Sequence, residues 1–326
     1  MYVSEDISED GVVGEKLIKV TLKNPVKIEN VIFEPRVCVF SKYMEPFIER
    51  IANYEVREDD LWITGFPKSG NTWTQEMCWL IQNDFNFEKA KSVGIEIRCP
   101  FFEVSATLLT PFDSLEEISK MEGCRCIHTH LQAPLLPKEI WKKNAKVIYV
   151  ARDPRDVAVS LYEHMNNWYD LRVSKNEVYK LFLCGKLVWS PYFDHILEYW
   201  KLRNRPNVLF LTYEEMKTNL KEVILKTCKF LNKNINNEQM TKTLDHLSFN
   251  SMRTGKIKNL IYDYDCDKSH FSRFIRRGIV GSYKDELSPE QINVFNEWMR
   301  ENLKDTDCNL RYNEINLTLL FLCQQF

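Results

Sequence analysis

The chain has 326 residues, and its 44 Lys and Arg residues against 46 Asp and Glu give a formal net charge of −2, which excludes a nucleic-acid binder that works by bulk charge. Hydrophobic residues make up 44% of the chain and charged residues 28%, the proportions of a globular protein, which excludes a disordered, collagen-like or coiled-coil chain. The 10 cysteines show no pairing rhythm and no apolar run is long enough to span a bilayer, so we expect a reduced, cytoplasmic protein without a membrane segment.

The two ends of the chain differ from its middle. Residues 1–16 form a polar, acidic leader that can bury little apolar surface, so we expect them to be flexible. Residues 17–312 are interpreted as one domain, because no repeat or low-complexity linker interrupts their central part. This domain opens with short apolar stretches around Val31–Phe33 and Val37–Phe40, which predict a small hairpin, and we expect a helix over Lys42–Asn53. The tail, residues 313–326, is apolar for a terminus and either packs on the domain or promotes aggregation.

From Leu61 onward, short apolar runs alternate with longer amphipathic segments. The alternation is typical of β-α-β units, so we predict an α/β fold with a central parallel sheet flanked by helices. The predicted strands are Leu61–Thr64, Cys124–His128, Lys146–Val150 and Val208–Leu211. The predicted helices are Thr72–Asn83, Asp113–Met121, Asp153–Asn167, Lys175–Leu183, Pro191–Asn204, Asn219–Leu231, Glu238–His246 and Ser288–Asn302.

A glycine-bounded turn follows the first of these strands. Gly65 and Gly70 stand five residues apart, and the hydroxyl residue Thr72 follows, which nearly matches a P-loop. Asn71 occupies the usual lysine position, and the lysine lies three residues upstream at Lys68. A turn on a helix N-terminus aims backbone N–H groups at an anion, so the pattern indicates a P-loop-like nucleotide-binding fold. The alternative is a plain strand-to-helix turn with a surface lysine.

Two further basic segments lie along the chain. The strand ending at Val150 runs into Arg152, where a magnesium-dependent kinase would want an acidic residue, and Ser160 follows about two turns along the next helix. This favours a phosphorylated nucleotide held by basic groups without an obligatory metal, although a solvated Arg–Asp cluster is the plainer interpretation. A second basic segment is suited to wrapping a phosphate, and it contains Lys268, Arg273, Arg276, Arg277 and Gly278.

Thiols and imidazoles alternate at Cys124, Cys126, His128 and His130. Alternate residues of a strand share one face at roughly 6.6 Å spacing, so the four cannot converge on one tetrahedral metal ion. A histidine just after a parallel strand is better placed as a general base, which makes His130 the candidate. His128, inside the strand, is interpreted as structural.

Five separated segments resemble the cytosolic sulfotransferases, and the segments Val56–Asp60 and Trp73–Glu76 resemble an arthropod branch of that family. The five segments are Pro67–Trp73, Thr129–Leu131, Val150–Ser160, Tyr213–Met216 and Arg276–Gly281. Members of this family transfer a sulfuryl group from 3′-phosphoadenosine 5′-phosphosulfate (PAPS) to a hydroxyl or amine, and release adenosine 3′,5′-bisphosphate (PAP). The resemblance implies the same donor and product, with no metal.

The resemblance also implies roles for individual residues. His130 would take the acceptor's proton and Lys68 would stabilise the departing phosphate oxygen, with Ser160 as a third catalytic residue. The donor would be held by Lys68, Ser69, Gly70, Asn71, Thr72, Trp73, Arg152, Ser160, Tyr213, Ser248, Phe249, Arg276, Arg277 and Gly278. The family's dimer motif is degraded here to Lys284, Ser288-Pro289 and Asn293, so a homodimer is left open.

Aromatic residues would line the acceptor pocket and favour a small hydrophobic alcohol, phenol or amine. Steroids and retinoid-like alcohols are examples of this class. The candidate residues are Phe40, Phe101, Phe102, Tyr162, His164, Trp168 and Tyr192, and core packing is the alternative for each. Two other functions remain open: a metal-dependent P-loop phosphotransferase, and a catalytically inactive binder of a hydrophobic ligand.

Overall fold

A four-stranded parallel sheet forms the centre of the molecule. The computed structural model describes residues 2–10, 14–108, 110–168, 173–254, 275–308 and 310. The sheet has the order β7-β6-β8-β9. Its strands are β6 (Leu61–Thr64), β7 (Cys126–Thr129), β8 (Lys146–Ala151) and β9 (Val208–Thr212). The predicted α/β class and all four predicted strands are confirmed, although β7 begins two residues later than expected.

The sheet is buried on both faces, which is why its strands appear in the sequence as continuous apolar runs. Leu61 pairs with Cys126 on one side and with Lys146 on the other, so the strands end at a common edge. Leu61 and Ile63 pack in one core with helices α2 and α11, whereas Trp62 and Tyr149 belong to a second core on the opposite face.

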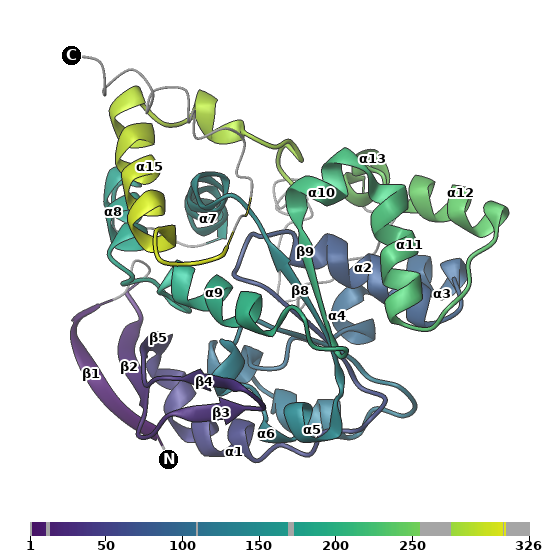
Figure 1. The fold of residues 1–326 in the computed structure, drawn as a ribbon, viewed down its shortest axis with the longest axis horizontal. Coiled ribbons are helices and arrows are strands. Elements are labelled where there is room, and N and C mark those ends of the chain that lie inside the picture. The colour runs from purple at the N-terminus through teal and green to yellow at the C-terminus, as the bar shows by residue number, and fades with distance from the viewer. Residues whose placement is uncertain are drawn as a thin grey trace.

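Helices cover both faces of the sheet (Figure 1). Helices α7, α8, α9 and α15 lie on one side, and α2, α10, α11, α12 and α13 lie on the other. The α-helices are α1 (Ile48–Ala52), α2 (Asn71–Gln82), α3 (Phe87–Ser92), α4 (Ile95–Arg98), α5 (Ser114–Ser119), α6 (Lys138–Lys143), α7 (Pro154–Trp168), α8 (Lys175–Leu183), α9 (Tyr192–Leu202), α10 (Tyr213–Thr218), α11 (Leu220–Phe230), α12 (Asn237–His246), α13 (Phe249–Arg253) and α15 (Pro289–Leu303). Short 3-10 helices span Lys42–Phe47, Val104–Ala106, Ala133–Leu135 and Ser282–Asp285.

The helices predicted downstream of Leu61 are confirmed to within about two residues at each end. The helix expected over Lys42–Asn53 is divided, because its first turn is a 3-10 helix that precedes α1. The short helices α3, α4, α6, α10 and α13 were not predicted.

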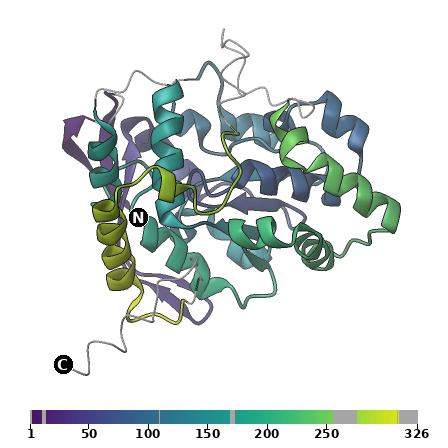
Figure 2. The same cartoon turned by 90° about the horizontal axis from the view of Figure 1, so that it is seen from above.

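The N-terminal strands form two small antiparallel sheets beside the helices at the α15 end of the molecule (Figure 2). One sheet has the order β1-β2-β5, with β1 (Tyr2–Asp10), β2 (Lys16–Leu22) and β5 (Val37–Ser41). The other is a hairpin of β3 (Val26–Ile28) and β4 (Val31–Phe33). The two apolar stretches from which a hairpin was predicted lie in different sheets, because Val31–Phe33 pairs with β3 and Val37–Phe40 pairs with β2.

A flexible leader is therefore the wrong description of Tyr2–Asp10. This segment pairs with β2, where Tyr2 stands opposite Leu22, and Asp6 forms an ion pair with Lys42. Backbone pairing along a neighbouring strand orders a polar segment that buries little apolar surface of its own. The tail, residues 313–326, lies outside the described residues.

Candidate active site

A cavity of about 410 Å³ opens at the carboxyl edge of the parallel sheet. The residues that follow each strand line the cavity. Strand β6 leads into the glycine-bounded loop, β7 into His130, β8 into Arg152 and β9 into Tyr213. Ligands of open parallel sheets bind at this edge, because the loops there are free to carry functional groups. The structure thus brings the separated sequence motifs to one place, as predicted.

The loop after β6 wraps tightly around the N-terminus of α2. Gly70 has a φ of 103° and precedes the helix, and a Cβ there would lie 2.7 Å from the ring of Tyr213. Lys68 also has a positive φ, of 68°. The Asn71 side chain donates to the carbonyl of Phe66 at 2.9 Å, which braces the turn from inside. An asparagine at this position therefore stabilises the loop itself, and the lysine charge comes from Lys68.

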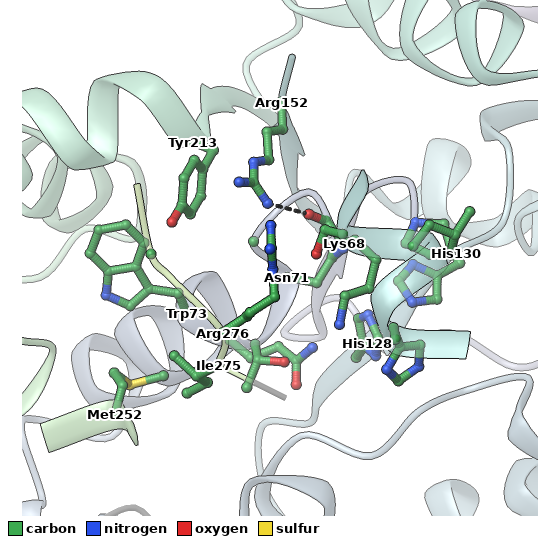
Figure 3. Close-up of a pocket in the computed structure, with 18 of the residues that line it drawn as sticks. Lys68, Asn71, Trp73, His128, His130, Arg152, Tyr213, Met252, Ile275 and Arg276 are labelled. Carbon is green, nitrogen blue, oxygen red and sulfur yellow. Dashed lines mark hydrogen bonds between the residues drawn. The ribbon is translucent and has the colours of Figure 1, made fainter. Parts of the chain in front are cut away.

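Three cations face the same space in the middle of the cavity (Figure 3). Lys68, Arg152 and Arg276 lie between the Trp73–Tyr213 side and the two histidines. Burial, and then the charges of Arg152 and Arg276, lower the pKa of Lys68 to about 7. Arg152 donates to the Lys68 carbonyl at 3.1 Å, while its buried Nε has no partner among the described residues. Such a cluster of cations fits a ligand with several negative charges.

Aromatic rings form one wall of the cavity. The Trp73 indole donates to the Leu247 carbonyl at 2.9 Å, and its ring meets that of Tyr213 at 5.7 Å between centroids. Phe249 lies against Gly278, where a Cβ would come within 2.3 Å of the phenyl ring. The glycine therefore allows the basic segment to approach a flat wall that suits a purine base.

His130 is held as a neutral imidazole with one nitrogen available. Its Nδ1 lies 2.6 Å from the Gly65 carbonyl oxygen, which can only accept, so Nδ1 carries the proton and Nε2 keeps its lone pair. Burial lowers the pKa of His130 to about 3, and the nearby Lys68 charge acts in the same direction. The ring is therefore in its proton-accepting form at neutral pH.

The backbone of His130 is held on both sides. Its N–H donates to the buried carboxylate of Glu103 at 2.6 Å, and Thr129 donates its hydroxyl to the other carboxylate oxygen at 2.7 Å. The carbonyl oxygen of His130 accepts from Nε2 of buried His195 at 2.9 Å, and Tyr149 lies 2.9 Å from the other ring nitrogen. Together with the contact between Nδ1 and Gly65, these contacts hold His130 at three points.

His128, interpreted from the sequence as structural, lines the cavity beside His130. Its ring lies 4.5 Å from that of His130, and its Nε2 is buried without a partner among the described residues. Alternation along β7 places both side chains on the same face, because they are two residues apart. Burial holds the pKa of His128 well below its ordinary value, so this ring is neutral too.

Only some of the predicted acceptor residues line the cavity. Phe101 and His164 line the cavity, as predicted. Phe102, Phe40 and Tyr192 do not, because each is at most 2% exposed and packs in the hydrophobic core. Tyr162 packs at the margin of that core, and the side chain of Trp168 lies outside the described residues. Apolar residues that also line the cavity and were not predicted include Val104, Leu108, Leu161, Met165, Trp189 and Ile279.

Most predicted donor residues line the cavity. Ser69 is instead buried inside the loop, and Ser248 caps α13 by accepting from the backbone of Ser251. Lys268 and Arg273 lie outside the described residues. The predicted donor residues that line it are Lys68, Gly70, Asn71, Thr72, Trp73, Arg152, Ser160, Tyr213, Phe249, Arg276, Arg277 and Gly278.

Metal ligands do not gather within the part of the chain that the structure describes: no three His, Cys, Asp or Glu side chains there could hold one ion. The helices among these residues are also too short or too polar to cross a membrane.

Residues 58–307 match the family described as the sulfotransferase domain. Luciferin sulfotransferase of Photinus pyralis is 38% identical over 278 residues, which cover 79% of this chain and 75% of that protein. Sulfotransferase 1B1 of Canis lupus familiaris is 33% identical over 266 residues, which cover 81% of this chain and 90% of that protein. The chain therefore belongs to the sulfotransferase family, and the protein is an enzyme of that class.

Solved structures agree with this assignment. Retinol dehydratase in complex with androsterone and the inactive cofactor PAP has a TM-score of 0.81 at 25% identity, over 94% of this chain and 97% of that one. A mouse sulfotransferase complexed with PAP has a TM-score of 0.66 at 27% identity, over 83% of this chain and 93% of that one. The predicted central sheet and P-loop-like fold are those of known sulfotransferases.

Proposed function

We propose that this sulfotransferase uses PAPS to sulfate the hydroxyl of a small hydrophobic acceptor, with His130 as the general base. One observation carries the proposal. A neutral imidazole with a free ring nitrogen lines the same cavity as Lys68, Arg152 and Arg276. A base and a cluster of cations in one cavity suit the transfer of an anionic group to a hydroxyl oxygen.

The donor would occupy the side of the cavity formed by the loop, the aromatic wall and the basic segment. The N-terminus of α2 and Lys68 would hold the 5′-phosphosulfate. Trp73 and Phe249 would hold the adenine, and Arg152, Ser160 and Arg276–Gly278 the 3′-phosphate. The cation cluster and the close approach of Gly278 to Phe249 support this arrangement.

When bound, the donor supplies a sulfuryl group that passes to the acceptor oxygen as its bond to the 5′-phosphate oxygen breaks. His130 Nε2 accepts the proton that the acceptor hydroxyl loses. Lys68 in its charged form donates to the phosphate oxygen on which negative charge develops. The contacts to Glu103 and His195 keep His130 in position, so that little reorganisation is needed during transfer.

The acceptor would bind beside His130, where Phe101, Trp189 and Leu108 line the cavity. Apolar and aromatic walls around a few polar groups favour a flat, hydrophobic phenol or alcohol. A relative named for luciferin, and retinol dehydratase in complexes with androsterone and with retinol, support this class of acceptor. A cytoplasmic location and a homodimer stay predictions.

Calorimetry in EDTA tests the donor site by comparing the binding of PAP, ADP and ATP. The proposal predicts a metal-independent preference for PAP, because only PAP carries both phosphates that the cations would hold. A preference for ATP that requires magnesium would instead support the phosphotransferase alternative. Sulfation of a panel of phenols and alcohols with PAPS then separates an active enzyme from an inactive ligand binder.

A further inference from the structure

The two arginines assigned above to the 3′-phosphate each have a carboxylate partner. Arg276 donates through Nη1 to Oε1 of Glu286 at 2.6 Å, and Arg277 donates to Asp285 at 2.5 Å. The other oxygen of Glu286 accepts from Nζ of Lys175 at 2.9 Å. Glu286 therefore links the basic segment to the start of α8.

The two carboxylates differ in their surroundings. The side chain of Glu286 is 21% exposed, whereas that of Asp285 is 62% exposed. Burial raises the pKa of Glu286, but the hydrogen bonds from Lys175 and Arg276 outweigh it and hold the pKa below its ordinary value. Glu286 is therefore ionised at neutral pH, in a setting where solvent screens its charge less than that of Asp285.

We propose that Glu286 is a built-in counter-ion that weakens the binding of the 3′-phosphate and thereby favours release of the PAP product. The inference rests on the proposed function, because it needs the 3′-phosphate at Arg276. A 3′-phosphate bound to the Arg276 guanidinium would share it with the Glu286 carboxylate. Both groups are negatively charged, so they repel each other at this short distance.

The sign of the effect follows from the charges. Lys175, Arg276 and Arg277 carry three positive charges, and Glu286, Asp285 and Glu163, which lies 4.0 Å from Lys175, carry three negative ones. Neutralising Glu286 leaves the three cations with two carboxylates, so the field at the phosphate becomes more favourable to an anion. Arg276 also keeps donors for the phosphate, because a guanidinium has five N–H groups and Glu286 accepts from only one of its terminal nitrogens.

The test compares Glu286→Gln, Glu286→Asp and Asp285→Asn by calorimetry with PAP and with adenosine 5′-monophosphate, which lacks the 3′-phosphate. We expect Glu286→Gln to bind PAP about tenfold more tightly. Its affinity for adenosine 5′-monophosphate should change less than about twofold, because the carboxylate acts at the 3′ position. Glu286→Asp retains the negative charge, and Asp285→Asn removes a more exposed one. The PAP affinity of both variants should therefore remain close to that of the wild type.

Stopped-flow displacement measures the dissociation rate of PAP, which should fall in Glu286→Gln by a factor similar to the gain in affinity. Unchanged or weaker PAP binding by Glu286→Gln would overturn the inference and give Glu286 a role in holding Arg276 in place. If wild-type enzyme binds PAP no better than adenosine 5′-monophosphate, the proposed donor site itself is wrong. Thermal unfolding of each variant shows that the comparison is made between folded proteins.

Discussion

Lys68 links donor binding to pH at the scale of a single residue. Burial and the neighbouring arginines lower its pKa to about 7, so Lys68 loses its charge as the pH rises above the neutral range. A bound phosphate favours the charged ammonium and raises the pKa. Donor binding must therefore be accompanied by proton uptake above pH 7, and the affinity of the site must fall as the pH rises.

Between pH 7 and pH 9, we predict that PAP affinity falls by up to about tenfold per pH unit. Calorimetry in two buffers with different ionisation enthalpies would measure the proton uptake directly. Lys68→Arg is the matched control, because arginine stays charged throughout this range and its PAP affinity should be nearly flat. A flat profile in the wild-type enzyme would show that Lys68 is already charged before the donor binds.

At the scale of secondary-structure elements, the contact between Gly278 and α13 sets the shape of the donor site. Gly278 has a φ of 62°, and an added Cβ would lie 2.3 Å from the ring of Phe249. Gly123 has a similar φ of 68°, with no atom within 4 Å of an added Cβ. Comparing alanine substitutions at the two glycines therefore distinguishes the effect of backbone strain, which both share, from the effect of the contact with Phe249, which only Gly278 makes.

Gly278→Ala is expected to weaken PAP binding by about tenfold or more, because Phe249 or the basic segment must move. Gly123→Ala should lower stability by about 1 kcal/mol through the same kind of strain, and leave PAP affinity unchanged. Calorimetry and thermal unfolding of both variants measure the two effects. Equal PAP affinity in the two variants would mean that the approach of Gly278 to Phe249 does not shape the site.

The elements that surround the site could be predicted because their signals are local. The strand Leu61–Thr64 is a short apolar run, and the helix Lys175–Leu183 has regular apolar spacing, so both were found at or near their true bounds. Short helices such as α4 have only one turn and depend on packing for their stability, so periodicity does not reveal them.

The site residues that were not predicted depend on contacts between segments far apart in the sequence. Glu103 meets His130 across 27 positions and His195 meets it across 65, and neither belongs to a local motif. Phe102 was placed in the pocket because aromatic residues fill cores and pockets alike, and sequence does not separate these cases. His128 could have been found from the two-residue spacing to His130, which places both side chains on the same face of a strand.

At the scale of the whole molecule, the N-terminal strand β1 lies outside the cavity. None of the described residues of β1 lines the cavity, and the side chains of Tyr2–Ile7 are exposed or half-buried. Its anchors are the backbone pairing with β2 and the ion pair between Asp6 and Lys42. We therefore assign β1 to stability and not to ligand binding.

Deletion of residues 2–10 should lower the free energy of unfolding, because the edge of β2 becomes exposed. The melting temperature should fall by about 2–4 °C for each kcal/mol of unfolding free energy that is lost. The kcat of the shortened enzyme and its affinity for PAP should match those of the full chain. Differential scanning calorimetry and steady-state kinetics provide the two readouts. Loss of PAP binding in a folded, shortened enzyme would show that β1 supports the donor site.

The most direct test of the whole account is the single-turnover rate of His130→Ala with bound PAPS and a phenol acceptor. We predict a fall of at least about 10²-fold in the rate of sulfuryl transfer, because the proton acceptor is lost. PAP affinity, measured in parallel, should remain nearly that of the wild type, because the cations that hold the nucleotide are intact. An unchanged transfer rate would contradict the account and remove His130 from the mechanism.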